Sequence, residues 1–171
     1  VFDSSSNMSG TMAAQIKTQL NSVLGTTRPI FQDYLSTQKF SAISDSIFLN
    51  EPDLEAVVVF TPAGASYQKT AVLEKVTGRT AGILTSLATH MPTYFSDVDR
   101  MRRVVKVPYS DDRVFIFEKV SEEATQRTTI FMVIARMSEA AEMFRTSLSQ
   151  KMYLVSEEGT VLFGPEGTPG T

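Results

Sequence analysis

A single histidine and the absence of cysteine restrict the chemistry that this chain can perform. The sequence has 171 residues, with His90 as its one histidine and no cysteine. Disulfide bonds, iron–sulfur clusters, cysteine-rich zinc sites and thiol nucleophiles are therefore excluded. A multi-histidine metal site or a Ser-His relay is also hard to build. We therefore expect an interaction or sensing domain, or an enzyme that uses only carboxylates and hydroxyls.

Arginines and tyrosines in the middle of the chain are candidates for contact with a ligand. Arg102 lies between Tyr94 and Tyr109, just before an apolar segment. Such an arginine can bind a carboxylate through two parallel hydrogen bonds, while a tyrosine hydroxyl orients the ligand. The alternative interpretation is that Arg102 pairs in solvent with nearby aspartates such as Asp97 or Asp111.

Arg136 is a second kind of candidate, because it ends an otherwise apolar segment. It could reach a ligand from a strand end, or it could extend its charged group into water, as strand-end arginines often do. No catalytic residue, metal site or cofactor is predicted. The predicted ligand-binding residues are Tyr94, Arg102, Tyr109, Phe117 and Arg136.

Motifs typical of enzymes are incomplete in this sequence. Residues 36–39 (Ser-Thr-Gln-Lys) match the S-x-x-K string of penicillin-recognising acyl enzymes, but the partner strings S-D-N and K-T-G are absent. Glu51, Asp53 and Glu55 form a carboxylate cluster of the kind that glycosidases use in pairs. They lie at an expected turn and strand edge, which indicates solvated surface. We therefore predict that this chain is not an enzyme, and a small hydrolase stays an alternative.

Length and composition fit one domain with its own hydrophobic core. Hydrophobic residues make up 42% of the chain and the net charge is -3. A chain of this length buries enough surface to fold alone, and its acidic balance argues against a nucleic-acid partner. No segment approaches the roughly 18–20 consecutive apolar residues that span a bilayer. The start at Val1 and the Gly- and Pro-rich end are those expected of a piece of a longer protein, with membrane segments outside it.

The first part of the chain has helical periodicity. Pro29 cannot donate a hydrogen bond to Gly25, so it should weaken or kink a helix there. The hydrophobic spacing resumes afterwards, and we expect a helix over residues 9–48 with Ser9 as its N-cap. The residues that recur every three or four positions before the proline are Met8, Met12, Ile16, Leu20, Val23 and Leu24.

Runs of β-branched and aromatic residues predict strands after residue 53. The run from Leu54 to Phe60 is nearly continuous and favours a central strand covered on both faces. Residues 80–88 have helical spacing that Met91-Pro92 should break, and Ser138 should cap a short helix. This order predicts an α+β domain with an antiparallel sheet. The other expected strands are 65–68, 104–109, 113–120, 128–137, 151–155 and 160–163.

Two segments share one local pattern, an apolar strand followed by a tight glycine-containing turn and a return strand. They are residues 57–64 and 152–163. Behind a long N-terminal helix, this pattern resembles Cache domains, the PAS-like extracytoplasmic sensors of bacterial transmembrane receptors. Residues 50–57 resemble that family's entry from the helix into its first strand. The segments that resemble its middle strands are 94–96, 104–109, 113–117 and 128–135.

The resemblance implies a single Cache-type domain, with a long N-terminal helix packed on a central antiparallel PAS-like sheet. Residues 1–50 would be the signalling helix, 51–164 the sensor core and 165–171 a truncated linker. A small molecule would bind between the sheet and a crossover over residues 67–101. The domain would form a homodimer through its N-terminal helix, on the extracytoplasmic side of a membrane-anchored parent protein. The alternative interpretation is a cytoplasmic PAS- or GAF-like regulatory module.

Overall fold

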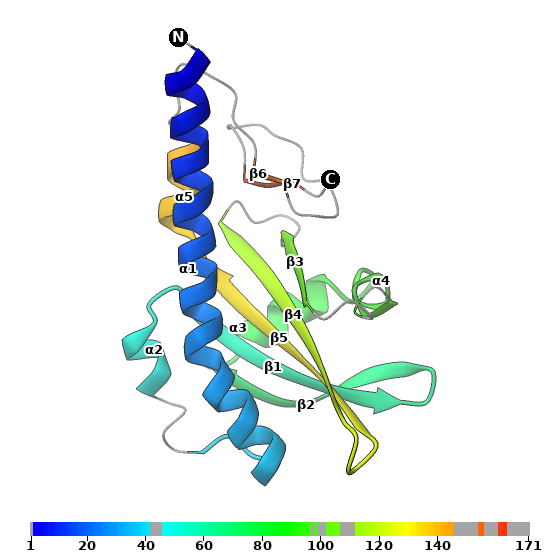
Figure 1. Ribbon diagram of the computed structural model, residues 1–171. Coiled ribbons are helices and arrows are strands. Elements are labelled where there is room, and N and C mark those ends of the chain that lie inside the picture. The colour runs from blue at the N-terminus through cyan, green and yellow to red at the C-terminus, as the bar shows by residue number, and fades with distance from the viewer. Residues whose placement is uncertain are drawn as a thin grey trace.

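The computed structural model describes residues 2–41, 46–96, 98, 102–106, 112–145, 154–155 and 161–163. Figure 1 shows a long helix beside a sheet, with shorter helices around them. The helices are α1 (Phe2–Thr37), α2 (Ile47–Asn50), α3 (Arg79–Ser86), α4 (Met91–Ser96) and α5 (Ser138–Arg145). The strands are β1 (Leu54–Ala63), β2 (Ser66–Glu74), β3 (Arg102–Lys106), β4 (Arg113–Glu122), β5 (Arg127–Arg136), β6 (Leu154–Val155) and β7 (Val161–Phe163).

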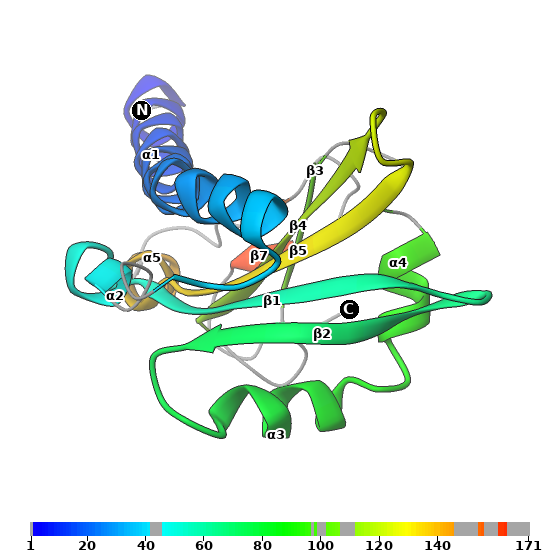
Figure 2. The ribbon, with the colours of Figure 1, turned by 90° about the horizontal axis from the view of Figure 1, so that it is seen from below.

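A single antiparallel sheet forms the centre of the described part of the chain. Its five strands have the order β2-β1-β5-β4-β3. Helix α1 lies on one face, and α3 and α4 lie on the other (Figure 2). We call these the α1 face and the crossover face, because the chain crosses the second face between β2 and β3. The predicted α+β class, with an N-terminal helix and an antiparallel sheet, is confirmed.

One side of α1 is buried against the sheet. The buried positions follow the spacing of three and four that the sequence predicts, although the side chains of Met8 and Met12 lie outside the described part. The ring of Phe31 stacks on that of Phe131 in β5, with 4.1 Å between the ring centroids. The buried residues of α1 are Ile16, Val23, Leu24, Thr27, Ile30, Phe31 and Tyr34.

Helix α1 runs from Phe2 to Thr37, so the expectations of Ser9 as its N-cap and of a helix through residue 48 are both wrong. Gln38 has a positive φ of 58°, and its N–H donates to the carbonyl of Tyr34 at 2.7 Å. A left-handed residue at this position stops a helix. The later hydrophobic residues pack on the α1 face instead, partly from α2. Pro29 stays inside α1, whose axis bends in the lower part of Figure 1, as the missing hydrogen bond to Gly25 predicts.

Strands β1 and β5 occupy the interior of the sheet and are buried on both faces. Residues 56–60 and 130–135 are buried without interruption. This confirms the central, doubly covered strand that the continuous apolar run predicts. Strand β1 continues past Phe60 to Ala63, and the turn that follows contains Gly64, with a φ of 64°.

A bulge interrupts the start of β1. The pairing with β5 shifts between Leu54 and Ala56, so Glu55 is an extra residue on this strand. Leu54 then belongs to the hydrophobic cluster of the α1 face, whereas Ala56 belongs to that of the crossover face. Two residues that are two apart would otherwise share a face. The bulge therefore brings Glu55 to the crossover side of the sheet.

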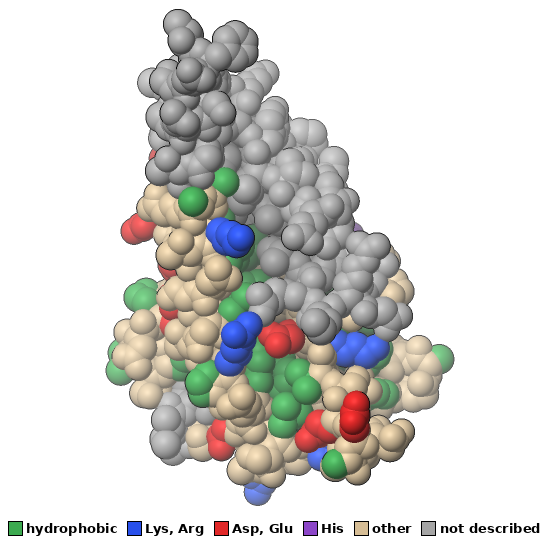
Figure 3. All heavy atoms as spheres, in the orientation of Figure 1, with side chains coloured by type: hydrophobic (Ala, Val, Ile, Leu, Met, Phe, Trp, Pro, Cys, Tyr) green, Lys and Arg blue, Asp and Glu red, His purple; other side chains and the backbone are tan. Residues whose placement is uncertain are grey.

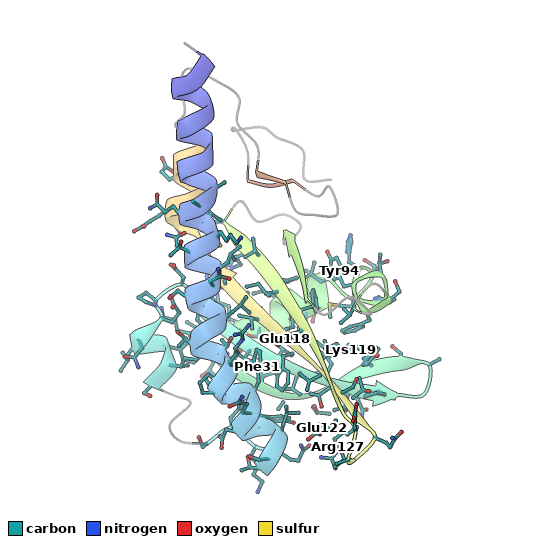
Figure 4. The ribbon with its side chains drawn as sticks, viewed as in Figure 1. Phe31, Tyr94, Glu118, Lys119, Glu122 and Arg127 are labelled. Atoms are coloured by element: carbon teal, nitrogen blue, oxygen red, sulfur yellow. The ribbon has the colours of Figure 1, made fainter. Side chains whose placement is uncertain are left out.

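Two hydrophobic clusters share the sheet. The ring of Tyr94 lies on the opposite face from that of Phe31 (Figure 4). On the α1 face, the sheet contributes Leu54, Val57, Val59, Leu73, Val114, Ile116, Phe131, Val133 and Ala135. On the crossover face, it contributes Ala56, Val58, Phe60, Phe115, Phe117, Ile130, Met132 and Ile134, and the crossover adds Leu87, Met91, Tyr94 and Val98.

The crossover differs in two ways from the sequence prediction. Residues 67–74 belong to β2, so the crossover begins after Glu74 rather than at residue 67. Pro92 does not stand between helices, because it lies in the first turn of α4. Proline is tolerated there, since the first N–H groups of a helix have no partner within it.

The last described elements flank this body. Met137 and Ala141 at α5 join the cluster of the α1 face. Strands β6 and β7 pair antiparallel, as the predicted hairpin requires, and β7 contacts α5 and β3. Among the described residues, none of the helices combines the length and the apolar character that crossing a membrane requires.

Candidate functional site

A cavity of about 150 Å³ lies between α3 and the sheet. It opens at the edge where β1 begins and β5 ends, on the crossover face. Its charged and polar lining consists of Glu55, Lys75, Arg79, Thr80 and Arg136. Its apolar lining consists of Pro52, Ala56, Val76, Ile83 and Ile134. The site combines an apolar wall with cationic groups, which is typical of a small-molecule pocket.

The carboxylate of Glu55 is the central anion of this site. Its side chain is only 11% exposed. Arg113 Nε donates to Glu55 Oε2 at 2.8 Å, and Arg113 Nη2 donates to Oε1 at 3.4 Å. This is the two-point geometry by which a guanidinium recognises a carboxylate. The pair holds Glu55 in one orientation at the bottom of the cavity.

Two further arginines approach the same carboxylate more loosely. Arg79 Nη1 lies 3.9 Å from Glu55 Oε1, and Arg136 Nη1 lies 4.0 Å from it. Both distances exceed that of a hydrogen bond. The side chains of Arg79 and Arg136 are 45% and 46% exposed, so both guanidinium groups also face solvent.

Asp112 fixes the position of Arg136. Arg136 Nε donates to Asp112 Oδ2 at 2.7 Å, and the Ser138 hydroxyl donates to the same oxygen at 3.1 Å. The hydrogen bond with Asp112 raises the pKa of Arg136 above its ordinary value. Arg136 therefore stays cationic at every physiological pH.

Lys75 lines the cavity, and Asp53 lies near enough to Lys75 for their charges to interact. Lys75 Nζ donates to the carbonyl of Pro52 at 3.2 Å. Burial raises the pKa of Asp53, and the charges of Glu51 and Glu139 raise it further, whereas Lys75 lowers it. The carboxyl of Asp53 is therefore protonated more readily than that of an ordinary aspartate as the pH falls.

Glu74 positions α3 over the sheet. Its carboxylate accepts hydrogen bonds from the N–H groups of Gly78 at 2.6 Å and Thr80 at 3.0 Å. The bond from Gly78 is the main reason why the pKa of Glu74 lies below its ordinary value. Gly78 has a φ of 81°, a left-handed conformation that glycine adopts at little cost. These contacts hold the first turn of α3, which carries Arg79.

The five predicted ligand-binding residues do not form one site. Tyr94 and Phe117 lie together in the crossover-face core, with 5.7 Å between their ring centroids. Arg136 lies at the cavity. Arg102 is in β3 opposite Glu118, and its side chain lies outside the described part. Tyr109 also lies outside the described residues.

Arg136 is separated from Phe117 along the sheet. Phe117 pairs with Met132, four residues before Arg136 on β5. At about 3.4 Å per residue this corresponds to roughly 14 Å. Aromatic rings fill the space under α4, where Tyr94 and Phe95 contact Phe117. The cavity therefore lies under α3, away from these rings.

Several residues of the cavity were not predicted from the sequence. Glu51 and Glu55 were expected on a solvated surface, which is wrong, because Glu51 is 7% exposed and the side chain of Glu55 is 11% exposed. One signal was available: Glu55 interrupts a run of apolar residues. Nothing in the local sequence indicated that Arg79 and Arg113, 34 residues apart, would meet this carboxylate.

Ser36 and Lys39 of the enzyme-like string and the single histidine, His90, line neither the cavity under α3 nor the open groove near the end of α1. Ser36 and Lys39 are exposed at the end of α1, and the Ser36 hydroxyl donates to the carbonyl of Asp33 at 2.9 Å. His90 is exposed, and its Nδ1 lies 3.2 Å from the Thr89 hydroxyl. Among the described residues, no three His, Cys, Asp or Glu side chains form a group that could hold a metal ion.

A second, open groove lies at the other end of the sheet, near the end of α1. Arg127 is its one charged lining residue among those described, and Glu122 lies directly opposite Arg127 in the ladder of β4 and β5, so this cation already has a carboxylate beside it. The groove is lined by Tyr34, Gln38, Thr61, Pro62, Thr70, Gln126, Arg127 and Thr128. The cavity under α3 is therefore the stronger candidate for a ligand.

Comparison of the chain with protein-family models, with curated proteins and with solved structures gave no match.

Proposed function

We propose that this chain is the extracytoplasmic sensor domain of a bacterial membrane receptor, and that it binds a small molecule without catalysing a reaction. The observation that carries the proposal is the cavity under α3, because it combines a cationic rim with an apolar wall. The extracytoplasmic position and the membrane-anchored parent protein come from the resemblance of the sequence to Cache domains.

The arrangement of the layers supports a PAS-like sensor. A PAS-like sheet has one face partly covered by the crossover between its strands. Here α3 and α4 cover that face, whereas α1 packs on the other (Figure 2). A ligand in the cavity would contact both the sheet and the crossover, so its binding would favour one arrangement of the two.

A short chain of contacts leads from the cavity to α1. The N–H of Arg136 donates to the carbonyl of Asp53 at 2.7 Å. Two residues earlier, the buried carboxylate of Glu51 accepts a hydrogen bond from the hydroxyl of Ser22 in α1 at 2.9 Å. Residues 51–53 therefore connect the cavity wall with the helix. A coupling of about 1–3 kcal/mol through such contacts is enough for a regulatory signal.

The proposal includes a homodimer formed through α1. The helix has 36 residues, and only one of its sides packs on the sheet. In Figure 3, which has the orientation of Figure 1, hydrophobic side chains are visible at the surface among the charged ones. The partly buried hydrophobic residues of this layer are Leu20, Leu35, Phe40, Phe48, Ala71 and Val120.

The proposal is tested by thermal denaturation of this chain with a panel of metabolites. A ligand at 100 times its dissociation constant stabilises the folded state by about 2.7 kcal/mol, which corresponds to roughly 5–10 °C for a domain of this size. Ile83→Trp should fill the cavity and abolish the shift. Leu49→Trp should retain it, because Leu49 is 85% exposed on α2.

An unchanged shift in Ile83→Trp would place the ligand elsewhere and would contradict the proposed site. The absence of any stabilising compound in a broad panel would contradict the sensor function itself. Circular dichroism of both variants without ligand checks that each retains the fold.

A further inference from the structure

We infer that the cavity under α3 binds a small monocarboxylate with an apolar body of a few carbon atoms. This inference rests on the proposed function, because it names the class of ligand for the same site. Arg79 and Arg136 would hold the carboxylate. The hydrophobic wall would hold the carbon chain.

The charge of the lining favours an anion. Three cationic residues and one carboxylate line the cavity, and that carboxylate, Glu55, already accepts two hydrogen bonds from Arg113. Arg79 makes no closer ion pair among the described residues than its 3.9 Å approach to Glu55. One guanidinium group at the rim therefore lacks a carboxylate of its own.

The other carboxylates near the cavity are engaged elsewhere. Asp112 accepts from Arg136 Nε and from Ser138. Glu74 accepts from the backbone at the start of α3, and Asp53 is partly buried beside Lys75 and Glu51. None of these three lines the cavity.

The positions of the two arginines suit one carboxylate. The Nη1 atoms of Arg79 and Arg136 both lie within 4.0 Å of the same oxygen of Glu55, so they flank one point in space from α3 and from β5. Charge-assisted hydrogen bonds form at about 2.7–2.9 Å. While Arg136 Nε stays on Asp112, its Nη groups and the half-exposed guanidinium group of Arg79 can reach this distance to a bound anion, and Arg113 keeps Glu55 in place.

The size and the wall of the cavity limit the rest of the ligand. A cavity of about 150 Å³ holds a molecule of the size of benzene, on the order of six to eight non-hydrogen atoms. Ala56 and Ile134 line it from the sheet, and Val76 and Ile83 line it from α3 and the turn before it. Bare phosphate would leave this wall in contact with water or with charge. A short-chain carboxylate buries it.

A matched set of probes tests this ligand class. Butanoate, butan-1-ol and butan-1-amine share one carbon chain and differ in charge, and inorganic phosphate supplies an anion without the chain. Each is titrated into the ¹⁵N-labelled full chain while amide resonances are followed by NMR. We expect butanoate alone to shift Ala56, Ile83 and Ile134, with a dissociation constant of about 1 mM.

Variants separate specific binding from a general salt effect. Arg79→Gln should weaken butanoate binding at least tenfold, because a charge-assisted contact is lost. Arg28→Gln removes the same charge from an exposed position on α1 and should leave the dissociation constant unchanged. Since Arg79 makes only a loose ion pair, Arg79→Gln should remain folded.

Four results would overturn the inference. Equal or tighter binding of the alcohol or the amine would reject the anion but would leave the proposed small-molecule site standing. Equal binding of phosphate would reject the apolar body. Equal loss of affinity in Arg79→Gln and Arg28→Gln would reject the role of Arg79. No shift of the three resonances with any probe would reject the binding of a short-chain carboxylate in this cavity.

Discussion

At the scale of single residues, the carboxylate of Glu55 offsets the electrostatic repulsion between two arginines. Arg113 and Arg136 lie directly opposite each other in the ladder of β4 and β5. Like charges at such positions repel each other. The bulge in β1 brings Glu55 to both, and Asp112 binds Arg136 from the other side. The carboxylate that shapes the cavity therefore also stabilises the end of the sheet.

Removal of the charge of Glu55 should destabilise the fold. Glu55→Gln leaves Arg113, which is only 18% exposed, without its paired carboxylate. Removing one partner of a buried ion pair costs about 3–5 kcal/mol, and we expect a loss at the lower end of this range because both side chains are partly exposed. Urea denaturation measures the change. Glu123→Gln, in an exposed turn, should change stability by less than about 0.5 kcal/mol, and equal values for the two variants would contradict the prediction.

At the scale of secondary-structure elements, the placement of α3 decides whether a cavity exists. This helix carries Arg79, Thr80 and Ile83, which form one side of the cavity. No N-cap side chain bonds its first turn, because the N-cap position is Gly78. Glu74, at the end of β2, takes this role through its bonds to the backbone. The strand before the helix thus fixes where the helix begins.

Glu74→Ala should lower stability by about 1 kcal/mol at neutral pH, as the loss of a helix cap does. Because the pKa of Glu74 is lowered in the folded state, its contribution is complete above the ordinary glutamate range and is lost as the pH falls through the lowered value. The difference from the unaltered protein should therefore shrink between pH 7 and pH 3.

Denaturation curves at several pH values measure this difference. Glu123→Ala removes a carboxylate from an exposed turn and serves as the control. A difference that grows on acidification would contradict the role given to Glu74.

At the scale of the whole molecule, one sheet serves two hydrophobic cores. Adjacent residues of β4 and β5 point alternately toward α1 and toward the crossover, so both layers depend on the same strands. Because the interior is closely packed, a displacement of one layer changes the packing of the other layer on the shared strands. This arrangement is suited to a domain in which a ligand on one face affects a helix on the other.

The docking of α1 should depend on the aromatic pair between Phe31 and Phe131. Phe31→Ala removes a stacked ring from the α1 face, which should cost about 3–4 kcal/mol. The melting temperature should fall by roughly 10 °C. Leu49→Ala, at an exposed position, should have little effect. Similar melting temperatures for the two variants would show that α1 is not held to the sheet by this pair.

The fold class and most of the helices and strands follow from the amino-acid pattern alone. The continuous apolar run of β1 predicts a buried central strand, since a strand covered on both faces needs no polar side. The spacing in α1 predicts its buried side. The end of α1 was not predicted, because Phe40 and Phe48 continue the hydrophobic spacing from a loop and from α2. Hydrophobic periodicity indicates which residues are buried, and residues of separate elements can be buried against the same core without belonging to one continuous helix.

The candidate site was decided almost wholly by the tertiary structure. Arg136 was identified from its place at the end of an apolar strand. Glu55, Arg79 and Arg113 come from three separate elements, and a bulge that depends on the pairing of β1 with β5 brings the carboxylate to them. Local sequence determines which residues are apolar or charged. Which charges meet is determined by strand register and by the path of the crossover, because electrostatic contacts form between residues distant in the chain.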